Sequence, residues 1–287
     1  MKILLTGRTG QIGWELERRL APLGEMVALD RTGLDLARPE SVGPVVHSIR
    51  PDLIVNAAGY TAVDRAESET QACFAINAES VGELARQAAQ LGALLVHYST
   101  DYVFDGAKRS PYVETDSTAP RNAYGRSKLQ GESQILSSGC RHLILRTSWV
   151  YASRGTNFVQ TMLRLARERP QLRVVDDQFG APTWARDIAG ATLAALDQPR
   201  AAEGLYHVAS GGVTTWCELA RSILALSGLD TPVVAIPTSE YPTAAARPSY
   251  SVLDSGAFER ATGFQIGPWA ERLGVCLSDA SSPRLRR

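Results

Sequence analysis

The amino-terminal stretch Lys2–Gly13 reads KILLTGRTGQIG, and the fold class follows from it. Residues 2–6 form an apolar run typical of a buried strand, and apolar side chains recur at helical spacing through 11–23. The glycines remove Cβ atoms where a turn needs positive φ and where backbone must approach a phosphate. The spacing alone also fits an ordinary strand–helix turn, but its position favours dinucleotide binding. The residues expected to bind the cofactor here are Gly7, Gly10, Gln11, Ile12 and Gly13.

Short apolar runs alternate with amphipathic segments through the first half of the chain. Continuous apolar strands separated by helices of ten or more residues indicate a parallel sheet covered on both faces. The sequence therefore predicts an α/β fold with a doubly wound, Rossmann-type sheet. The expected strands after the first are 26–29, 52–56, 93–98 and 142–146, and the expected helices after the first are 39–49, 67–91 and 123–136.

Beyond residue 150 this alternation loosens, and prolines punctuate a loop-rich stretch. We expect residues 1–150 to form the dinucleotide-binding core, 151–280 to form mainly a smaller α/β substrate-binding lobe interwoven with it, and 281–287 to be a tail. The expected helices in this part are 157–167, 185–196 and 215–226, and the expected strands are 172–175, 205–208 and 233–236.

The composition is that of an ordinary water-soluble enzyme. Of 287 residues 44% are hydrophobic and 21% charged, and thirty basic residues balance thirty acidic ones, which argues against nucleic-acid and membrane-surface partners. No apolar run approaches the length that spans a bilayer, and charged residues interrupt any secretory signal. The four cysteines lie far apart without a CxxC pair, so we expect reduced thiols in a cytoplasmic protein.

Three further segments are expected to contact the cofactor. Asp30 ends the second strand about 20 residues after the turn, where an acidic side chain accepts hydrogen bonds from the adenosine ribose. Asp30 favours NADH, whereas the neighbouring Arg31 can attract the 2′-phosphate of NADPH, so the preference stays open. Asp35 and Leu36 lie where a loop can flank the adenine. The small residues that end the third strand and allow close passage of the cofactor are Ala57, Ala58 and Gly59.

The residues that point to chemistry follow the fourth strand. Thr100 stands at the end of that strand, and Tyr124 and Lys128 lie four residues apart on the next helix, which places them on one face. Lys128 is one of only three lysines in the chain, although basic residues are common in it. A phenol beside an ammonium suits proton transfer. Tyr98, on the fourth strand, is also expected at the cofactor site.

With these residues the chain resembles the extended short-chain dehydrogenase/reductase family. Further blocks narrow the resemblance to the dTDP-4-dehydrorhamnose reductases within it, and the likeness runs from residue 1 to about residue 275. These blocks are STDYVF at 99–104, RTSWVY at 146–151, GAPT at 180–183 and RP at 247–248.

The resemblance implies NAD(P)H-dependent reduction of the C4 ketone of a nucleotide-linked deoxysugar. Tyr124 would donate the proton, Lys128 would lower the pKa of that phenol and hold the nicotinamide ribose, and Thr100 would hydrogen-bond the reacting oxygen or the phenol. Thr61 would approach both ligands. The other residues expected to bind the sugar nucleotide are Val63, Asp101, Trp149, Asn157 and Arg247.

Some members of the family bridge two subunits through a metal held by acidic residues. Glu15 matches one of those positions, but Arg186 stands where a second acid is expected. We therefore predict no metal, and the sequence leaves open whether the protein is a monomer or a homodimer.

Three alternatives remain at this stage. The substrate can be another nucleotide-linked 4-keto sugar, and the chain can be a non-catalytic regulatory subunit on the same fold. The presence of Thr100, Tyr124 and Lys128 together argues against the second. An epimerase or dehydratase on this fold is a third, but Asp101-Tyr102 supplies only one carboxylate where a dehydratase normally has two.

Overall fold

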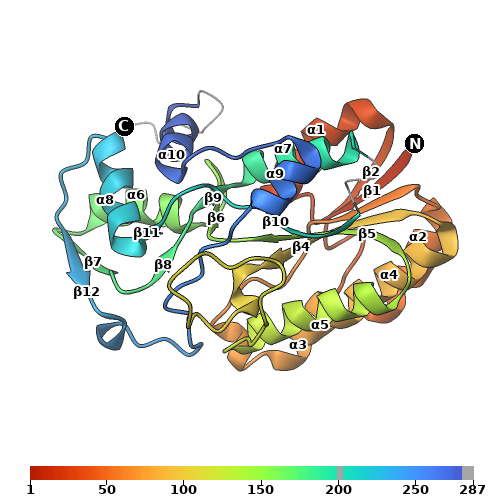
Figure 1. The fold of residues 1–287 in the computed structure, drawn as a ribbon, viewed down its shortest axis with the longest axis horizontal. Coiled ribbons are helices and arrows are strands. Elements are labelled where there is room, and N and C mark those ends of the chain that lie inside the picture. Colours follow the sequence, from red (N-terminus) through yellow and green to blue (C-terminus); the bar gives the residue numbers. More distant parts are fainter. Residues whose placement is uncertain (199–202, 280–287) are drawn as a thin grey trace.

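The computed structural model describes residues 1–198 and 203–279, so the expected tail at 281–287 lies outside the described residues (Figure 1). Its centre is a parallel sheet of six strands in the order β10-β5-β4-β3-β1-β2, which confirms the predicted doubly wound fold. These strands are β1 (Lys2–Thr6), β2 (Glu25–Leu29), β3 (Leu53–Asn56), β4 (Leu94–Thr100), β5 (Arg141–Thr147) and β10 (Gly204–His207).

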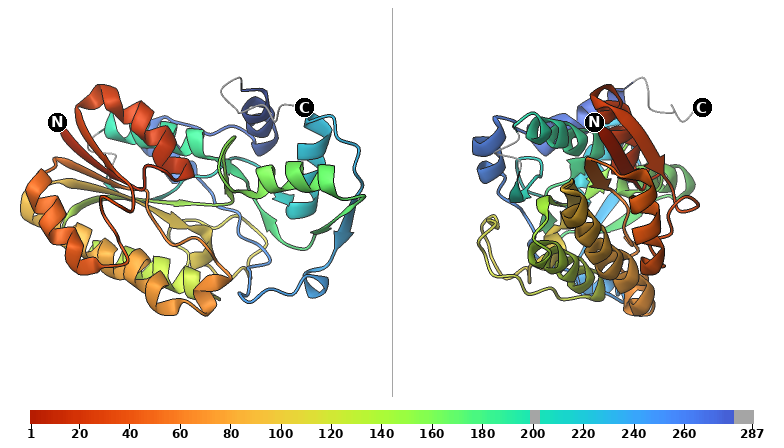
Figure 2. Two further views of the ribbon diagram at one scale, coloured as in Figure 1. Left: turned by 180° about the vertical axis from the view of Figure 1, so that it is seen from behind. Right: turned by 90° about the vertical axis from the view of Figure 1, so that its right-hand side faces the viewer.

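Helices cover both faces of the sheet because alternate residues of each strand point to opposite sides. Ile3 and Leu5 pack toward one helix layer and Leu4 toward the other, and all three are fully buried. Figure 2 shows the two layers on opposite faces. The first layer holds α1 (Gln11–Leu20), α7 (Ala185–Leu196) and α9 (Gly256–Thr262), and the second holds α2 (Val42–Ile49), α4 (Ser80–Leu91) and α5 (Ala123–Ser137).

The prediction of one regular helix over 67–91 is wrong in two respects: the helix begins at Thr70, and a π turn interrupts it. A 3₁₀ turn at Arg65–Glu67 precedes α3 (Thr70–Phe74), and a π-helical turn (Ala75–Glu79) joins α3 to α4. The buried side chain of Asn77 in the π turn hydrogen-bonds both the N–H and the C=O of Tyr60, at 2.8 and 3.0 Å. This long-range contact occupies the widened turn, and no local pattern in the sequence announces it.

The second lobe has a core of its own, separate from the sheet. Trp184, Leu163 and Ile223 belong to this core, and each is nearly or fully buried. The predicted strands 172–175 and 233–236 pair in parallel, whereas the one predicted at 205–208 is β10 of the main sheet. The elements of the lobe are β6 (Val150–Tyr151), α6 (Phe158–Glu168), β7 (Leu172–Val175), β8 (Phe179–Gly180), β9 (Thr183–Trp184), β11 (Thr214–Thr215), α8 (Trp216–Leu226), β12 (Val233–Ile236) and α10 (Trp269–Ser278).

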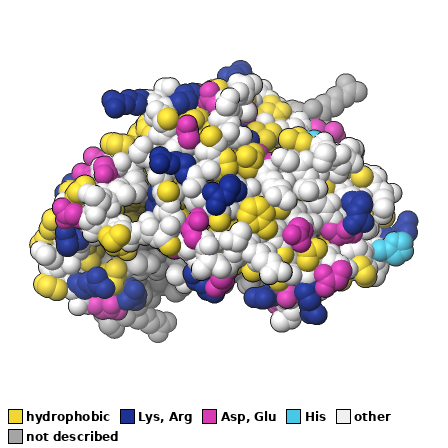
Figure 3. All heavy atoms as spheres, turned by 90° about the horizontal axis from the view of Figure 1, so that it is seen from below, with side chains coloured by type: hydrophobic (Ala, Val, Ile, Leu, Met, Phe, Trp, Pro, Cys, Tyr) yellow, Lys and Arg dark blue, Asp and Glu magenta, His cyan; other side chains and the backbone are white. Residues whose placement is uncertain are grey.

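The surface gives no sign of a single-sign charge patch on the face in Figure 3, where basic and acidic side chains are interspersed. Within the described part of the chain, no helix combines the length and the apolar character needed to cross a bilayer.

The remaining short 3₁₀ turns are Ala21–Leu23, Pro39–Ser41, Asp101–Val103 and Thr238–Glu240.

Candidate active site

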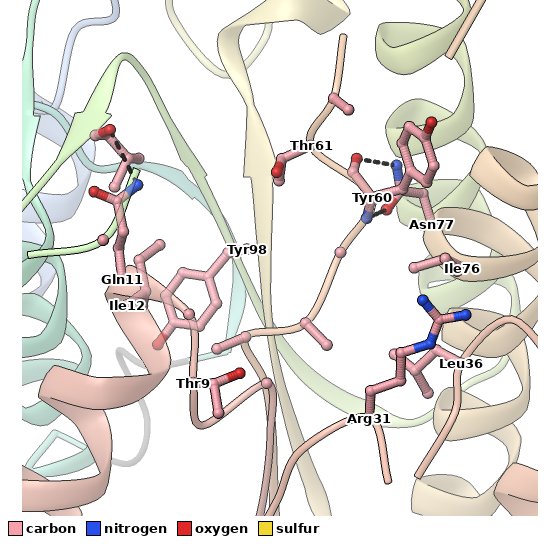
Figure 4. A pocket seen from close by; sticks show the side chains of 18 of the residues that line it. Thr9, Gln11, Ile12, Arg31, Leu36, Tyr60, Thr61, Ile76, Asn77 and Tyr98 are labelled. Atoms are coloured by element: carbon pink, nitrogen blue, oxygen red, sulfur yellow. Dashed lines mark hydrogen bonds between the residues drawn. The ribbon is translucent and has the colours of Figure 1, made fainter. Parts of the chain in front are cut away.

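A cavity of about 640 Å³ opens at the carboxyl ends of the parallel strands, where β1 and β3 lie side by side. This is the point at which the strand order reverses, and ligands of open α/β sheets bind there. Figure 4 shows Gln11 at one side of the cavity and Arg31 and Leu36 at the other. Every residue predicted to bind the cofactor lines this cavity except Gly13.

The glycine turn is shaped by close backbone contacts. Gly7 has a φ of +72°, and a Cβ on it would lie 2.6 Å from the backbone nitrogen of Ala58. A Cβ on Gly13 would lie 2.1 Å from the carbonyl oxygen of Gly7, so Gly13 packs α1 against the turn and does not line the cavity. Gly10 is the N-cap of α1 and brings no capping side chain, which leaves the first N–H groups of the helix for a ligand. The turn therefore fits a diphosphate.

The far end of the cavity carries the predicted adenosine contacts. One carboxylate oxygen of Asp30 accepts hydrogen bonds from the backbone N–H and the hydroxyl of Thr32, at 2.9 and 2.6 Å. These bonds hold the pKa of Asp30 below its usual value. Arg31 is largely exposed and lies 3.3 Å from Asp35. An acidic and a basic side chain thus both face this end, as expected from the sequence.

Helix α5 presents the predicted catalytic pair. Asn122 caps the helix by accepting a hydrogen bond from the N–H of Gly125 at 2.7 Å, and Tyr124 and Lys128 follow one turn apart. Both line the cavity. Burial raises the pKa of the Tyr124 phenol, against the effect of a hydrogen bond with Thr100. The lowering of that pKa by Lys128 stays a prediction for the occupied site.

Lys128 is 5% exposed, and its side chain reaches the end of β4. Its Nζ donates to the carbonyl oxygen of Tyr98 and lies 3.0 Å from Nε2 of His97. Burial lowers the pKa of Lys128 to about 8, while the charge of Glu132 acts in the opposite direction. The amine is therefore mostly charged at pH 7.

Thr100 and Asp101 lie behind the phenol at the end of β4. The hydroxyl of Thr100 donates to Asp101 at 3.0 Å and accepts from the N–H of Tyr102 at 3.1 Å, so it caps the following 3₁₀ turn. Burial raises the pKa of Asp101 to about 7. A capping role for Thr100 is compatible with a catalytic one, because its side chain is close enough to Tyr124 to lower the pKa of that phenol.

Trp149 follows β5 in a conformation that is rare for a non-glycine residue, with φ of +44°. Its ring stacks on Trp216 with centroids 3.5 Å apart and planes within 6°. A Cβ on Gly180 would lie 2.3 Å from the Trp149 indole. Strained backbone of this kind concentrates at ligand sites, and the tight stack fixes the orientation of the indole.

None of the six residues predicted to bind the substrate lines the cavity, and the last two of them already have partners: Thr100, Asp101, Trp149, Val63, Asn157 and Arg247. Arg247 forms a bidentate pair with Asp64, at 3.0 and 2.7 Å. The amide of Asn157 caps α6 through the N–H of Gln160 and donates to Gln11 at 3.0 Å. Val63 lies beside Asp64 in the loop after β3. Their contact with substrate stays a prediction.

Arg186, which departs from the family pattern, forms an ion pair with Glu15 at 3.4 Å. The guanidinium thus joins α7 to α1.

Sequence reasoning missed several residues of the cavity wall. Arg154, Gly155 and Thr156 come from the loop after β6, far along the chain from the glycine turn. The guanidinium of Arg154 lies 4.4 Å from the centre of the Trp14 ring, and its Nη1 has no hydrogen-bond partner among the described residues. A basic residue before a glycine was the only available signal, and it is a weak one.

Similarity to known proteins identifies the family of the chain. Residues 1–282 match the sequence model of the RmlD substrate binding domain. The chain belongs to the RmlD family. A curated relative, the dTDP-4-dehydrorhamnose reductase of Burkholderia thailandensis, is 50% identical over 298 residues, which cover 98% of this chain and all of the relative. The match confirms the resemblance read from the sequence blocks.

Solved structures agree with the membership in the RmlD family. A dTDP-4-dehydrorhamnose reductase from Clostridium acetobutylicum superposes with a TM-score of 0.93 at 37% identity, over 96% of this chain and 98% of that one. One from Bacillus anthracis, in complex with NADP, has a TM-score of 0.91 at 37% identity over the same shares.

Proposed function

We propose that the chain reduces the C4 ketone of dTDP-4-dehydro-L-rhamnose to dTDP-L-rhamnose with NADPH or NADH, in deoxysugar and polysaccharide biosynthesis. One observation carries the proposal: Tyr124 and Lys128 line the same cavity as the glycine turn, in a chain that is 50% identical to the dTDP-4-dehydrorhamnose reductase of Burkholderia thailandensis. Buried thiols at all four cysteines agree with a cytoplasmic enzyme.

The proton comes from Tyr124 in this proposal. Its phenol passes the proton to the carbonyl oxygen of the sugar while the bound reduced nicotinamide supplies a hydride. Because burial raises the pKa of the phenol, the charge of Lys128 has to favour proton release. In this proposal Thr100 hydrogen-bonds the reacting oxygen or the phenol and so holds the geometry.

In this proposal the chain's own groups hold the cofactor. The free N–H groups at the start of α1 bind the diphosphate, and Asp30 or Arg31 contacts the adenosine ribose. The small side chains of Ala57 and Ala58 allow the cofactor backbone to pass closely. Trp149, held by its stack on Trp216, contacts the deoxysugar, and Arg247 contacts the diphosphate of the sugar nucleotide.

The test is an absorbance assay at the nicotinamide band with both reduced cofactors and several nucleotide-linked 4-keto sugars. The proposal expects rapid oxidation of the cofactor with dTDP-4-dehydro-L-rhamnose and slower oxidation with the other sugars. No oxidation with any of them would refute it. Stoichiometric nicotinamide retained through purification would favour an epimerase, because a reductase must exchange its cofactor at each turnover.

A further inference from the structure

A buried chain of hydrogen bonds runs beneath the floor of the cavity to Lys128. The hydroxyl of Thr6 donates to Oδ1 of Asn56 at 2.7 Å, and Nδ2 of Asn56 lies 3.1 Å from Nδ1 of His97. Nε2 of His97 is 3.0 Å from Nζ of Lys128, which in turn donates to the Tyr98 carbonyl. The first three side chains are at most 1% exposed, and none of them has a part in the proposed reaction.

The direction of these bonds assigns the proton on His97. Burial and the neighbouring Lys128 hold the pKa of His97 well below its usual value, so the ring is neutral and carries one N–H. The carbonyl oxygen of Asn56 is taken by Thr6, so its amide N–H faces Nδ1, which must accept. The ring proton is then on Nε2 and points at Nζ of Lys128.

An N–H aimed at Nζ distinguishes the two forms of Lys128. A free amine has a lone pair that accepts this hydrogen bond, whereas an ammonium has none and meets the positive end of the N–H dipole. A hydrogen bond to the neutral form of a group disfavours its charged form. His97 therefore works against the charge on Lys128.

We propose that His97 is a positioning residue that acts through Lys128: the N–H that it points at Nζ sets the pH at which this lysine loses its charge. This inference rests on the proposed function, in which the charge of Lys128 assists Tyr124. Its observable consequence lies in the basic limb of the pH profile, since activity falls as Lys128 deprotonates.

The other ionisable groups around Lys128 come from its own helix, α5, and from α3. Glu132, on the same helix, favours the ammonium by its charge, but it is engaged by Arg146 at 2.7 Å and by Ser99. Cys73 on α3 also favours the ammonium when it is a thiolate, although burial raises the pKa of this thiol. Tyr124 stands one turn away on α5. His97 is thus the one neutral ring, among the described residues, whose proton opposes that charge.

The first test needs no substitution. The chain has four histidines, so ring ¹⁵N spectra of the labelled wild-type protein resolve the tautomer of each. At pH 9.5, where Lys128 is uncharged, the proposal expects the His97 proton on Nε2. A proton on Nδ1 would overturn it, whatever the activity of the protein.

The second test follows Lys128 itself. Because the chain has three lysines, ε-labelled lysine gives three NMR signals, and the one lost in Lys128→Met is Lys128. In His97→Leu the midpoint of its titration should rise by about one pH unit, since one hydrogen bond to the free amine is lost. The basic limb of reductase activity should move by the same amount. An unchanged or lower midpoint would contradict the proposal.

A matched control separates this effect from general loss of packing. His207, at the end of β10, is also fully buried, but its Nδ1 lies 3.0 Å from the backbone carbonyl oxygen of Tyr112. His207→Leu should lower stability without moving the Lys128 midpoint. If the wild-type protein shows no reductase activity, the proposed function fails, while the lysine titration still decides the role of His97.

Discussion

The cofactor side and the substrate side of the site are built in different ways. The proposed cofactor side consists of strand ends of one sheet and the first turns of helices beside them, and all of its predicted residues except Gly13 line one cavity. The substrate side consists of side chains from distant segments that already hold one another, as Trp149 holds Trp216 and Arg247 holds Asp64 across 183 residues. Backbone geometry follows from local spacing, whereas side-chain partnerships depend on the whole fold.

This difference has an energetic consequence. The first turn of α1 offers N–H groups without a capping side chain, so a diphosphate meets donors that are ready to bind. A sugar nucleotide that uses Arg247 has to share the guanidinium with Asp64. Substitutions on each side should therefore change different quantities.

Tyr124→Phe acts where the two sides meet and should have the largest effect. Loss of the general acid lowers turnover by about 10²–10⁴-fold, while cofactor binding is retained because the ring remains. NADPH oxidation at saturating sugar and cofactor titration by fluorescence measure the two quantities. Tyr102→Phe is the matched control, since that ring packs edge-on to Tyr124 at 5.9 Å without a predicted role in proton transfer. Wild-type turnover in Tyr124→Phe would refute the assignment.

Gly13→Ala should damage the cofactor side. The new Cβ would lie 2.1 Å from the backbone oxygen of Gly7, so the turn must shift. We expect cofactor affinity to fall about tenfold or more and the free energy of unfolding to fall by about 1–3 kcal/mol. Gly274→Ala, in α10 with open space around it, should instead stabilise by roughly 0.5–1 kcal/mol. Equal effects at both positions would contradict the packing argument.

Gly180→Ala should affect the substrate side alone. Its Cβ would lie 2.3 Å from the Trp149 indole, which must leave its stack on Trp216. The KM for the sugar nucleotide should rise severalfold, and the KM for NADPH should stay unchanged. Steady-state kinetics with each substrate varied in turn measure both. An equal rise in the two constants would show that the sides are not independent.

Asp101→Asn should have the smallest effect and should show in the pH dependence of stability. Burial raises the pKa of Asp101 to about 7, so below that pH the folded protein binds a proton that the unfolded chain has lost above its ordinary pKa of 3.8. Stability from this group is therefore present below pH 4 and is lost as pH rises to 7. The free energy of unfolding of the variant, relative to wild type, should increase by on the order of 2 kcal/mol between pH 5 and pH 8. A constant difference would contradict the raised pKa.

Much of the site follows from the sequence because its signals are local. The run from Lys2 to Gly13 implies a strand, a tight turn and a helix, since glycine chemistry and apolar spacing act over a few residues. Tyr124 and Lys128 share a helix face for the same reason. The helix over 185–196 and the strand over 172–175 were also predicted to the residue.

The contacts that tune these residues depend on how distant segments pack. Asn77 in the π turn contacts Tyr60, and His97 contacts Lys128. Neither pair is separated by a sequence spacing that a helix or a strand would repeat. The same is true of Trp216 beneath Trp149 and of Arg154 at the cavity wall. Such partners meet because the chain closes long loops, and loop closure leaves no periodic mark in the sequence. Local sequence patterns are enough to indicate the kind of chemistry, whereas the packing of distant segments sets how the reacting groups are held.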